Sequence, residues 1–186
     1  SKPEKYSPKV SSPEKPALGF RSWKLKDNRL YSVIASVPNT KTYSGIALKP
    51  GQNKASCYPL SFMYEGNHPE GKKHSSPSPD PKCSCGFYAF HTYSELKATP
   101  YSYHTLTKTV SGAVAGSGNM LVYENGWRAE QLQILGLLSD GVRPSISPSD
   151  DWLLLLNIAR FYQVPLFTDI NLLQRHSRRY ANQVSF

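Results

Sequence analysis

Three cysteines and one histidine near the middle of the chain could together hold a metal ion. Cys57, His74, Cys83 and Cys85 lie between positions 57 and 85, and the chain has no other cysteine. Zinc prefers thiolate and neutral imidazole ligands in a tetrahedral arrangement, and closed sites of three cysteines and one histidine are commonly structural. The pattern therefore predicts a structural Zn²⁺ site formed by these four side chains.

The segment between His74 and Cys83 needs an external clamp to become ordered. Residues 75–82 read Ser-Ser-Pro-Ser-Pro-Asp-Pro-Lys, and this density of proline excludes both a helix and a central strand. Pro81 and Gly86 favour a turn around the last two cysteines, which would let both thiols reach one ion. A bound metal ion would supply the order that the backbone lacks.

Other interpretations of the same residues stay open. The fourth ligand could be His68 or His91 in place of His74. The cysteines could also be small buried apolar side chains that bind nothing. A disulfide framework is disfavoured because the number of cysteines is odd.

A zinc enzyme is a further alternative. His68-Pro69-Glu70 and Pro81-Lys82-Cys83-Ser84-Cys85 resemble the H-x-E and P-C-x-x-C halves of the nucleobase deaminase signature. The cysteines are one residue too close, however, and the proline-rich interval cannot form the helices that carry such ligands. The chain also lacks a phosphate-binding loop, a glycine-rich dinucleotide motif and a Ser-His-Asp order. We therefore expect a protein that is not an enzyme.

Positive charge is concentrated at the two ends of the chain. Residues 1–30 hold eight Lys or Arg and three Asp or Glu, a net charge of +5, and residues 174–186 hold three Arg and no acid, a net charge of +3. Together these segments carry +8 of the formal +9. Such a distribution favours a polyanionic partner, above all DNA or RNA. The alternative is that the basic ends are merely solvated.

Several basic and aromatic residues are candidates for nucleic-acid contacts. Aromatic and basic side chains alternate near the first strand and again after the Asn125-Gly126 turn, where an aromatic ring could stack on a base while an arginine binds its edge or a phosphate. The alternative is that the tryptophan packs in the core and that residues 127–130 form a cross-strand ion pair. The candidates are Arg21, Trp23, Lys24, Trp127, Arg128, Arg175, Arg178 and Arg179.

Short strands and tight turns fill most of the chain, and two helices end it. Gly116-Ser117-Gly118-Asn119 and Asn125-Gly126 read as hairpin turns, the second of type I′ because that turn needs positive φ at both central residues. Ser147 and Thr168 are expected to cap the two helices. Strands are predicted over residues 18–25, 30–34, 42–48, 87–91, 109–115, 120–123 and 127–134. The first helix is expected to pack through Trp152, Leu155, Leu156, Ala159 and Tyr162, and the second through Ile170, Leu173, His176 and Tyr180.

These elements predict one α+β domain, namely a small, partly open β-barrel stapled by zinc and followed by one or two C-terminal helices. Residues 1–17 would be a basic Pro/Ser/Lys-rich arm, 18–146 the barrel and 147–186 the helices. No apolar run reaches the length of a membrane span, and the first residues lack a signal peptide's apolar region. Unpaired cysteines favour a reducing, cytoplasmic location.

Seven short motifs together resemble a family of short bacterial proteins over about residues 19–165. The resemblance implies His74 rather than His68 as the fourth zinc ligand, and it implies no activity. The chain departs from the family pattern in its longer basic arm and at Ser117-Gly118, where that pattern has a tryptophan-glycine pair. The motifs are GFRSW at 19–23, Cys57, HSSP at 74–77, CSCGFYA at 83–89, VSGAV at 110–114, ENGWRAE at 124–130 and YQVP at 162–165.

By architecture alone the expected fold is similar to PUA-like nucleic-acid modules, the SRA and ASCH groups. The functional prediction is therefore non-enzymatic binding of DNA or RNA, with the basic termini on phosphates and the barrel reading a base or a modified base. The alternative is a scaffold subunit that docks on a protein partner through its basic arm.

Overall fold

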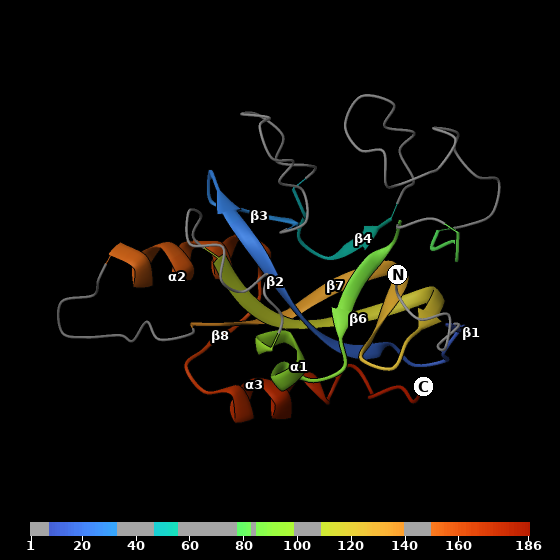
Figure 1. Cartoon of the computed structure of the whole chain (residues 1–186). Coiled ribbons are helices and arrows are strands. Elements are labelled where there is room, and N and C mark those ends of the chain that lie inside the picture. The colour runs from blue at the N-terminus through green and yellow to red at the C-terminus, as the bar shows by residue number, and fades with distance from the viewer. Residues whose placement is uncertain (1–7, 33–46, 56–77, 83–84, 99–108, 140–149) are drawn as a thin grey trace.

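The computed structural model describes residues 8–32, 47–55, 78–82, 85–98, 109–139 and 150–186 (Figure 1). Within these ranges the protein has eight strands in one mixed sheet and three helices, so the predicted α+β class is confirmed. The elements in chain order are β1 (Lys9–Ser11), β2 (Ala17–Lys26), β3 (Arg29–Ser32), β4 (Gln52–Lys54), β5 (Phe87–Phe90), α1 (Tyr93–Lys97), β6 (Thr109–Val122), β7 (Gly126–Leu138), α2 (Asp150–Tyr162), β8 (Leu166–Phe167) and α3 (Ile170–Ser177).

Four strands of the sheet pair in a closed cycle. β6 and β7 form a long antiparallel hairpin, β2 pairs with the other edge of β6, and β5 pairs with β7. The single aligned pair Phe20 and Phe90 joins β2 to β5 and closes the cycle. The short strands β1, β3, β4 and β8 attach to this cycle, and Figure 1 shows β2 running diagonally across β6 and β7.

The predicted hairpin turn at residues 116–119 is wrong. β6 continues through these residues, and the register with β7 shifts between Ser117 and Met120. One extra residue in β6 makes this a β-bulge, for which Gly118 supplies a positive φ of 76°. The carboxylate of Glu130 accepts from the Asn119 backbone at 3.1 Å and from its side chain at 3.0 Å. A bulge stabilised by an acid thus replaces the expected turn.

The predicted type I′ turn is also displaced. A short loop does join β6 to β7, but neither Asn125 nor Gly126 is among the described residues with positive φ. The turn with two positive φ values joins β2 to β3, at Asp27 (50°) and Asn28 (59°). Gly126 is required for another reason, because a Cβ there would collide with the backbone of Ala89.

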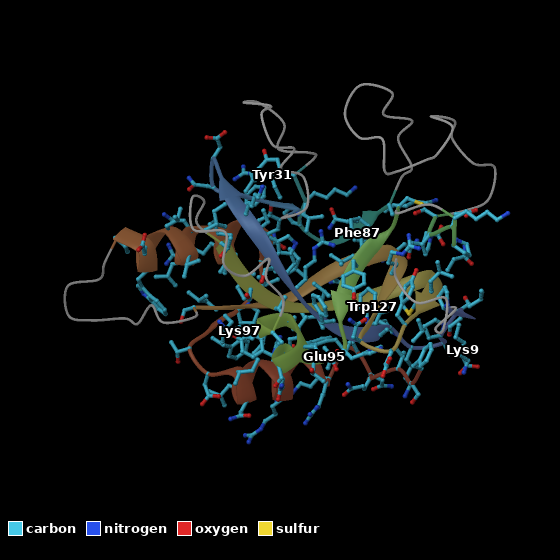
Figure 2. All side chains as sticks on the ribbon, in the orientation of Figure 1. Lys9, Tyr31, Phe87, Glu95, Lys97 and Trp127 are labelled. Carbon is cyan, nitrogen blue, oxygen red and sulfur yellow. The ribbon has the colours of Figure 1, made fainter. Side chains whose placement is uncertain are left out.

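The strands bury their alternate side chains on two faces. One cluster holds Trp23 and Trp127 together with the buried side of α2, and the other holds Phe20 and Leu96 together with α1 and α3. Figure 2 shows Trp127 in the interior, among the strands of the sheet. Alternation along β2 places neighbouring residues on opposite faces, as the sequence pattern predicts.

Both C-terminal helices are present. α2 buries Leu155, Ile158, Ala159 and Tyr162, whereas residues 147–149, which include the predicted cap Ser147, lie outside the described residues. Tyr162 ties α2 to the sheet, because its hydroxyl accepts from the Leu30 backbone at 2.9 Å and donates to the carbonyl of Leu48 at 2.7 Å.

α3 differs from its prediction at both ends. Its cap is Asp169 rather than Thr168, since the Asp169 carboxylate accepts from the Asn171 backbone at 2.6 Å. Leu173 is buried as predicted, whereas Tyr180 follows the helix, is 56% exposed and packs only against the ring of His176 among the described aromatic rings.

Part of the predicted N-terminal arm belongs to the sheet. β1 lies within the arm and pairs with the end of β6, with Lys9 opposite Val122 and Ser11 opposite Met120. Of the predicted strand over 42–48, residues 42–46 lie outside the described residues, and Leu48 donates to the Leu30 carbonyl at 2.9 Å outside any strand. Among the described helices, none combines the length and the apolar character needed to cross a bilayer.

Candidate functional site

Of the four predicted zinc ligands, the structure describes Cys85. Cys57, His74 and Cys83 lie outside the described residues, and so does the alternative ligand His68. Cys85 is buried. Within the described ranges no three His, Cys, Asp or Glu side chains group closely enough to hold a metal ion. The zinc site therefore stays a prediction from the sequence, with one of its ligands placed.

Arg128 of β7 holds the backbone that carries Cys85. Its Nη1 donates to the Cys85 carbonyl at 2.8 Å, and its Nη2 lies 3.4 Å from the Asp80 carbonyl. Its Nε and Nη2 also donate to the Tyr123 hydroxyl at 3.0 and 2.7 Å. Gly86, with φ of 101°, lets the chain pass close to Pro79. One guanidinium thus contacts the backbone at both Asp80 and Cys85, the last predicted ligand.

This arrangement gives Arg128 a role other than the expected contact with nucleic acid. All three of its nitrogen atoms donate to oxygen atoms of the protein, so the side chain has a structural task in this structure. The cross-strand ion pair of the alternative interpretation is made by Glu130, whose carboxylate lies 3.9 Å from Lys54 of β4 and also accepts from the Asn119 backbone.

His91 lies far from Cys85, at the other end of β5. The strand β5 lies between them, and its three residue steps alone span about 10 Å at about 3.3 Å per residue. The Nε2 of His91 also lies 2.8 Å from the Tyr123 carbonyl, to which it donates. Zinc ligands must all lie within about 2.3 Å of one ion, so His91 is excluded as a partner of Cys85.

The two candidate tryptophans belong to the core. Trp23 and Trp127 are both 0% exposed, so neither presents an aromatic face to a ligand. The Nε1 of Trp127 donates to the Leu18 carbonyl at 3.0 Å. Core packing, the alternative considered from the sequence, is what the structure shows, and base stacking on these two rings is excluded.

Arg21 fills the place where β2 and β5 separate. Its Nη1 donates to the Tyr88 carbonyl at 3.1 Å, while its buried Nε has no partner in the described structure. Burial lowers the pKa of Arg21 to about 10, because the charged guanidinium loses hydration that one backbone carbonyl only partly replaces. Arg21 is thus a poor candidate for a phosphate contact on the surface.

The two basic ends of the chain meet in space. Asn182 pairs with Ala17 in a parallel bridge, accepting from the Leu18 backbone at 2.7 Å and donating to the Pro16 carbonyl at 2.9 Å. Exposed Lys15 therefore lies beside the segment that carries exposed Arg178 and Arg179. The C-terminus lies beside the start of β2 and near β1 in Figure 1. Charges more than 160 positions apart in the sequence thus share one region of the surface.

The remaining basic candidate lies elsewhere. Lys24 is seven residues along β2 from Ala17, which corresponds to about 23 Å in a strand. Burial lowers its pKa. Nearby Arg29 is also engaged, with its guanidinium 3.4 Å from the centre of the Phe161 ring. The candidate residues for nucleic-acid binding therefore do not form one surface. The exposed arginines among them are Arg175, Arg178 and Arg179, which lie on α3 and the turn that follows it.

Two tyrosines beside Arg128 have roles that the sequence did not suggest. Tyr123 accepts from Arg128, and the Tyr88 hydroxyl donates to the Asn125 side chain at 3.3 Å. Burial raises the pKa of Tyr88 to about 12, with a further contribution from the negative charge of Glu95. Only the register of β5 against β7, which pairs Tyr88 with Arg128, brings these residues together.

Replacing Tyr88 with phenylalanine should alter the pH dependence of stability. The folded pKa lies above the ordinary value of 10.0, so the neutral phenol is favoured in the fold. The stabilisation of the fold by this raised pKa is fully present below about pH 10 and is lost as the pH rises towards 12. Urea unfolding from about pH 8 to about pH 11.5 should show a steeper loss of stability for the wild type than for Tyr88→Phe.

The difference between the two proteins is the informative quantity in this experiment. Arg21 acts in the opposite direction, because its folded pKa is lowered and its unfavourable burial is relieved as pH rises above about 10. Both proteins contain Arg21, so its effect cancels. Parallel stability curves would show that the Tyr88 hydroxyl has an ordinary environment.

Comparisons with models of protein families, with curated proteins and with solved structures each found no match.

Proposed function

We propose that this protein binds nucleic acid without catalysing a reaction on it, using its basic ends to contact phosphates. The observation that carries the proposal is the meeting of the two basic ends at the pairing of Ala17 with Asn182. Exposed Lys15, Arg178 and Arg179 gather there, and residues 170–186 contain no acid. Clustered, solvent-exposed arginine and lysine attract a phosphate backbone and release its counterions.

The finer parts of the sequence prediction belong to the same proposal. The closed cycle of strands supports a small, partly open β-barrel of PUA-like architecture. Zn²⁺ would be bound by Cys57, His74, Cys83 and Cys85, and the anchoring of Cys85 by Arg128 supports this site. An odd number of cysteines, which disfavours a disulfide framework, fits a cytoplasmic protein. The barrel's interior tryptophans are excluded as base readers, so base recognition would fall to other residues.

The test is a salt titration of binding to single-stranded and double-stranded DNA and RNA. The wild type should bind at low salt and lose affinity steeply between about 50 and 200 mM salt. Changing Arg175, Arg178 and Arg179 together to glutamine should weaken binding and flatten the slope of log affinity against log salt by about 2 on single strands, at about 0.7 per phosphate.

A charge-matched variant makes this result specific. Lys49, Lys82 and Arg160 are exposed and lie outside α3 and the C-terminal segment. Their joint change to glutamine lowers the net charge equally, and it should leave the slope nearly unchanged. Absence of binding at low salt would overturn the proposal and assign the basic ends to a protein partner, as in a scaffold subunit.

A further inference from the structure

The open face of α3 is defined by the residues that it buries. Ile170, Leu173, Ser177 and Ala181 recur at helical spacing, and the last three are 0%, 0% and 3% exposed. Because this stripe faces the sheet, the side chains between its members point away from the sheet. Arg175, Arg178 and Arg179 are among these and are exposed.

A row of three rings, here called the stack, borders this face, and neighbouring rings are tilted to each other by 47° and 53°. The rings of Phe167 and His176 lie 5.3 Å apart between centroids, and those of His176 and Tyr180 also lie 5.3 Å apart. Phe167 and His176 are half-buried, whereas Tyr180 is 56% exposed. Tyr180 is therefore the solvent-exposed end of the stack, and the ring of His176 contacts it from the buried side.

The backbone of Tyr180 is fixed on both sides. Its own N–H donates to the Ser177 carbonyl at 3.0 Å, and the N–H of Ala181 donates to the same carbonyl at 3.1 Å. The next residue, Asn182, is bonded to the start of β2 at Pro16 and Leu18. An aromatic ring held in this way loses little conformational entropy when a ligand packs on it.

We propose that Tyr180 is a base-stacking platform in a binding site for single-stranded nucleic acid, with Arg175, Arg178 and Arg179 on the flanking phosphates. This inference rests on the proposed function and names its strand form and its central residue. An exposed ring flanked by arginines combines the two parts of such sites, a π-face for a base and positive charge for the backbone. Bases in a duplex are stacked on each other, so their faces are closed to Tyr180.

The experiment measures binding of a fluorescent oligothymidine and of a duplex of equal length to Tyr180 variants of the full chain. Tyr180→Ala should weaken single-strand binding by roughly 5- to 150-fold, as expected for the loss of one stacked base. Its salt slope should stay that of the wild type, because no charge is removed. Tyr180→Phe should bind within about twofold of the wild type, since the ring is kept.

Two controls separate stacking from folding. Tyr180→Leu keeps apolar contact with His176 but has no aromatic face, so it should lose affinity like Tyr180→Ala while unfolding at the wild-type temperature. Phe186→Ala removes another exposed aromatic side chain, 49% exposed and outside the stack, and should bind like the wild type.

The outcomes also distinguish the two proposals. If Tyr180→Ala and Tyr180→Leu bind single strands like the wild type while the triple arginine variant loses affinity, the platform is refuted and the proposed function stands. Equal losses on single strands and duplex would likewise overturn the stacking role. If the wild type binds no nucleic acid at low salt, both proposals fall.

Discussion

Replacing Trp127 with alanine is expected to lower the free energy of unfolding by about 3 to 5 kcal/mol, the largest effect of any single substitution considered. The indole is fully buried and lies against Gly19 and Gly116, where added Cβ atoms would collide with it. It therefore fills a space that its neighbours leave open, and alanine would leave a cavity there. Urea unfolding followed by circular dichroism measures the loss.

The paired change of Trp23 and Trp127 to phenylalanine isolates the indole hydrogen bond. Both indoles are 0% exposed, but Trp127 donates to the Leu18 carbonyl, whereas the Nε1 of Trp23 has no partner in the described structure. Trp127→Phe should therefore cost about 1 kcal/mol more than Trp23→Phe. Equal costs would mean that the bond to Leu18 contributes nothing to stability.

Removing zinc is the second change for which we expect a large effect. The proposed site predicts one zinc ion per chain in the purified protein. A strong chelator should lower the free energy of unfolding, because zinc binds the folded chain and its binding free energy adds to the stability of the fold. Cys85→Ser should reduce the zinc content measured by atomic emission. A wild type purified without zinc, whose thiols react with a thiol reagent equally before and after chelation, would contradict the site.

Arg128 offers a sharper test of the same site, since it binds the carbonyl of Cys85 rather than an ion. Arg128→Met should weaken zinc affinity by about 10- to 100-fold, the usual effect of losing a group that orients a ligand. Arg29→Met removes another partly buried arginine, which packs on Phe161, and serves as the control with wild-type zinc affinity.

Local patterns predicted much of the fold. The recurrence of Leu155, Ala159 and Tyr162 predicts the buried face of α2, and the structure confirms it. Alternation of aromatic and basic residues over 18–25 predicts a strand, and β2 is present there. Such patterns succeed because side-chain direction repeats every 3.6 residues in a helix and every two in a strand.

Features that depend on partners distant in the sequence could not be predicted. Gly116-Ser117-Gly118-Asn119 has the composition of a turn, and it forms a bulge because β6 pairs with β7 on both sides of it and Glu130 accepts from Asn119. The meeting of residues 15–18 with residues 178–182 depends on the path of the whole chain. For the candidate site, exposed arginines followed from composition, but the ring stack that ends at Tyr180 required the turn after α3.

The closed cycle of strands has a consequence for association between copies of the protein. β6, β2, β5 and β7 each have neighbours on both edges over at least part of their length. The described strands outside the cycle, β1, β3, β4 and β8, are only two to four residues long. A second chain adding a strand needs a long row of unpaired backbone groups, and short edges offer few of them. The pairing of the described strands thus leaves little free edge on which copies of the protein could aggregate.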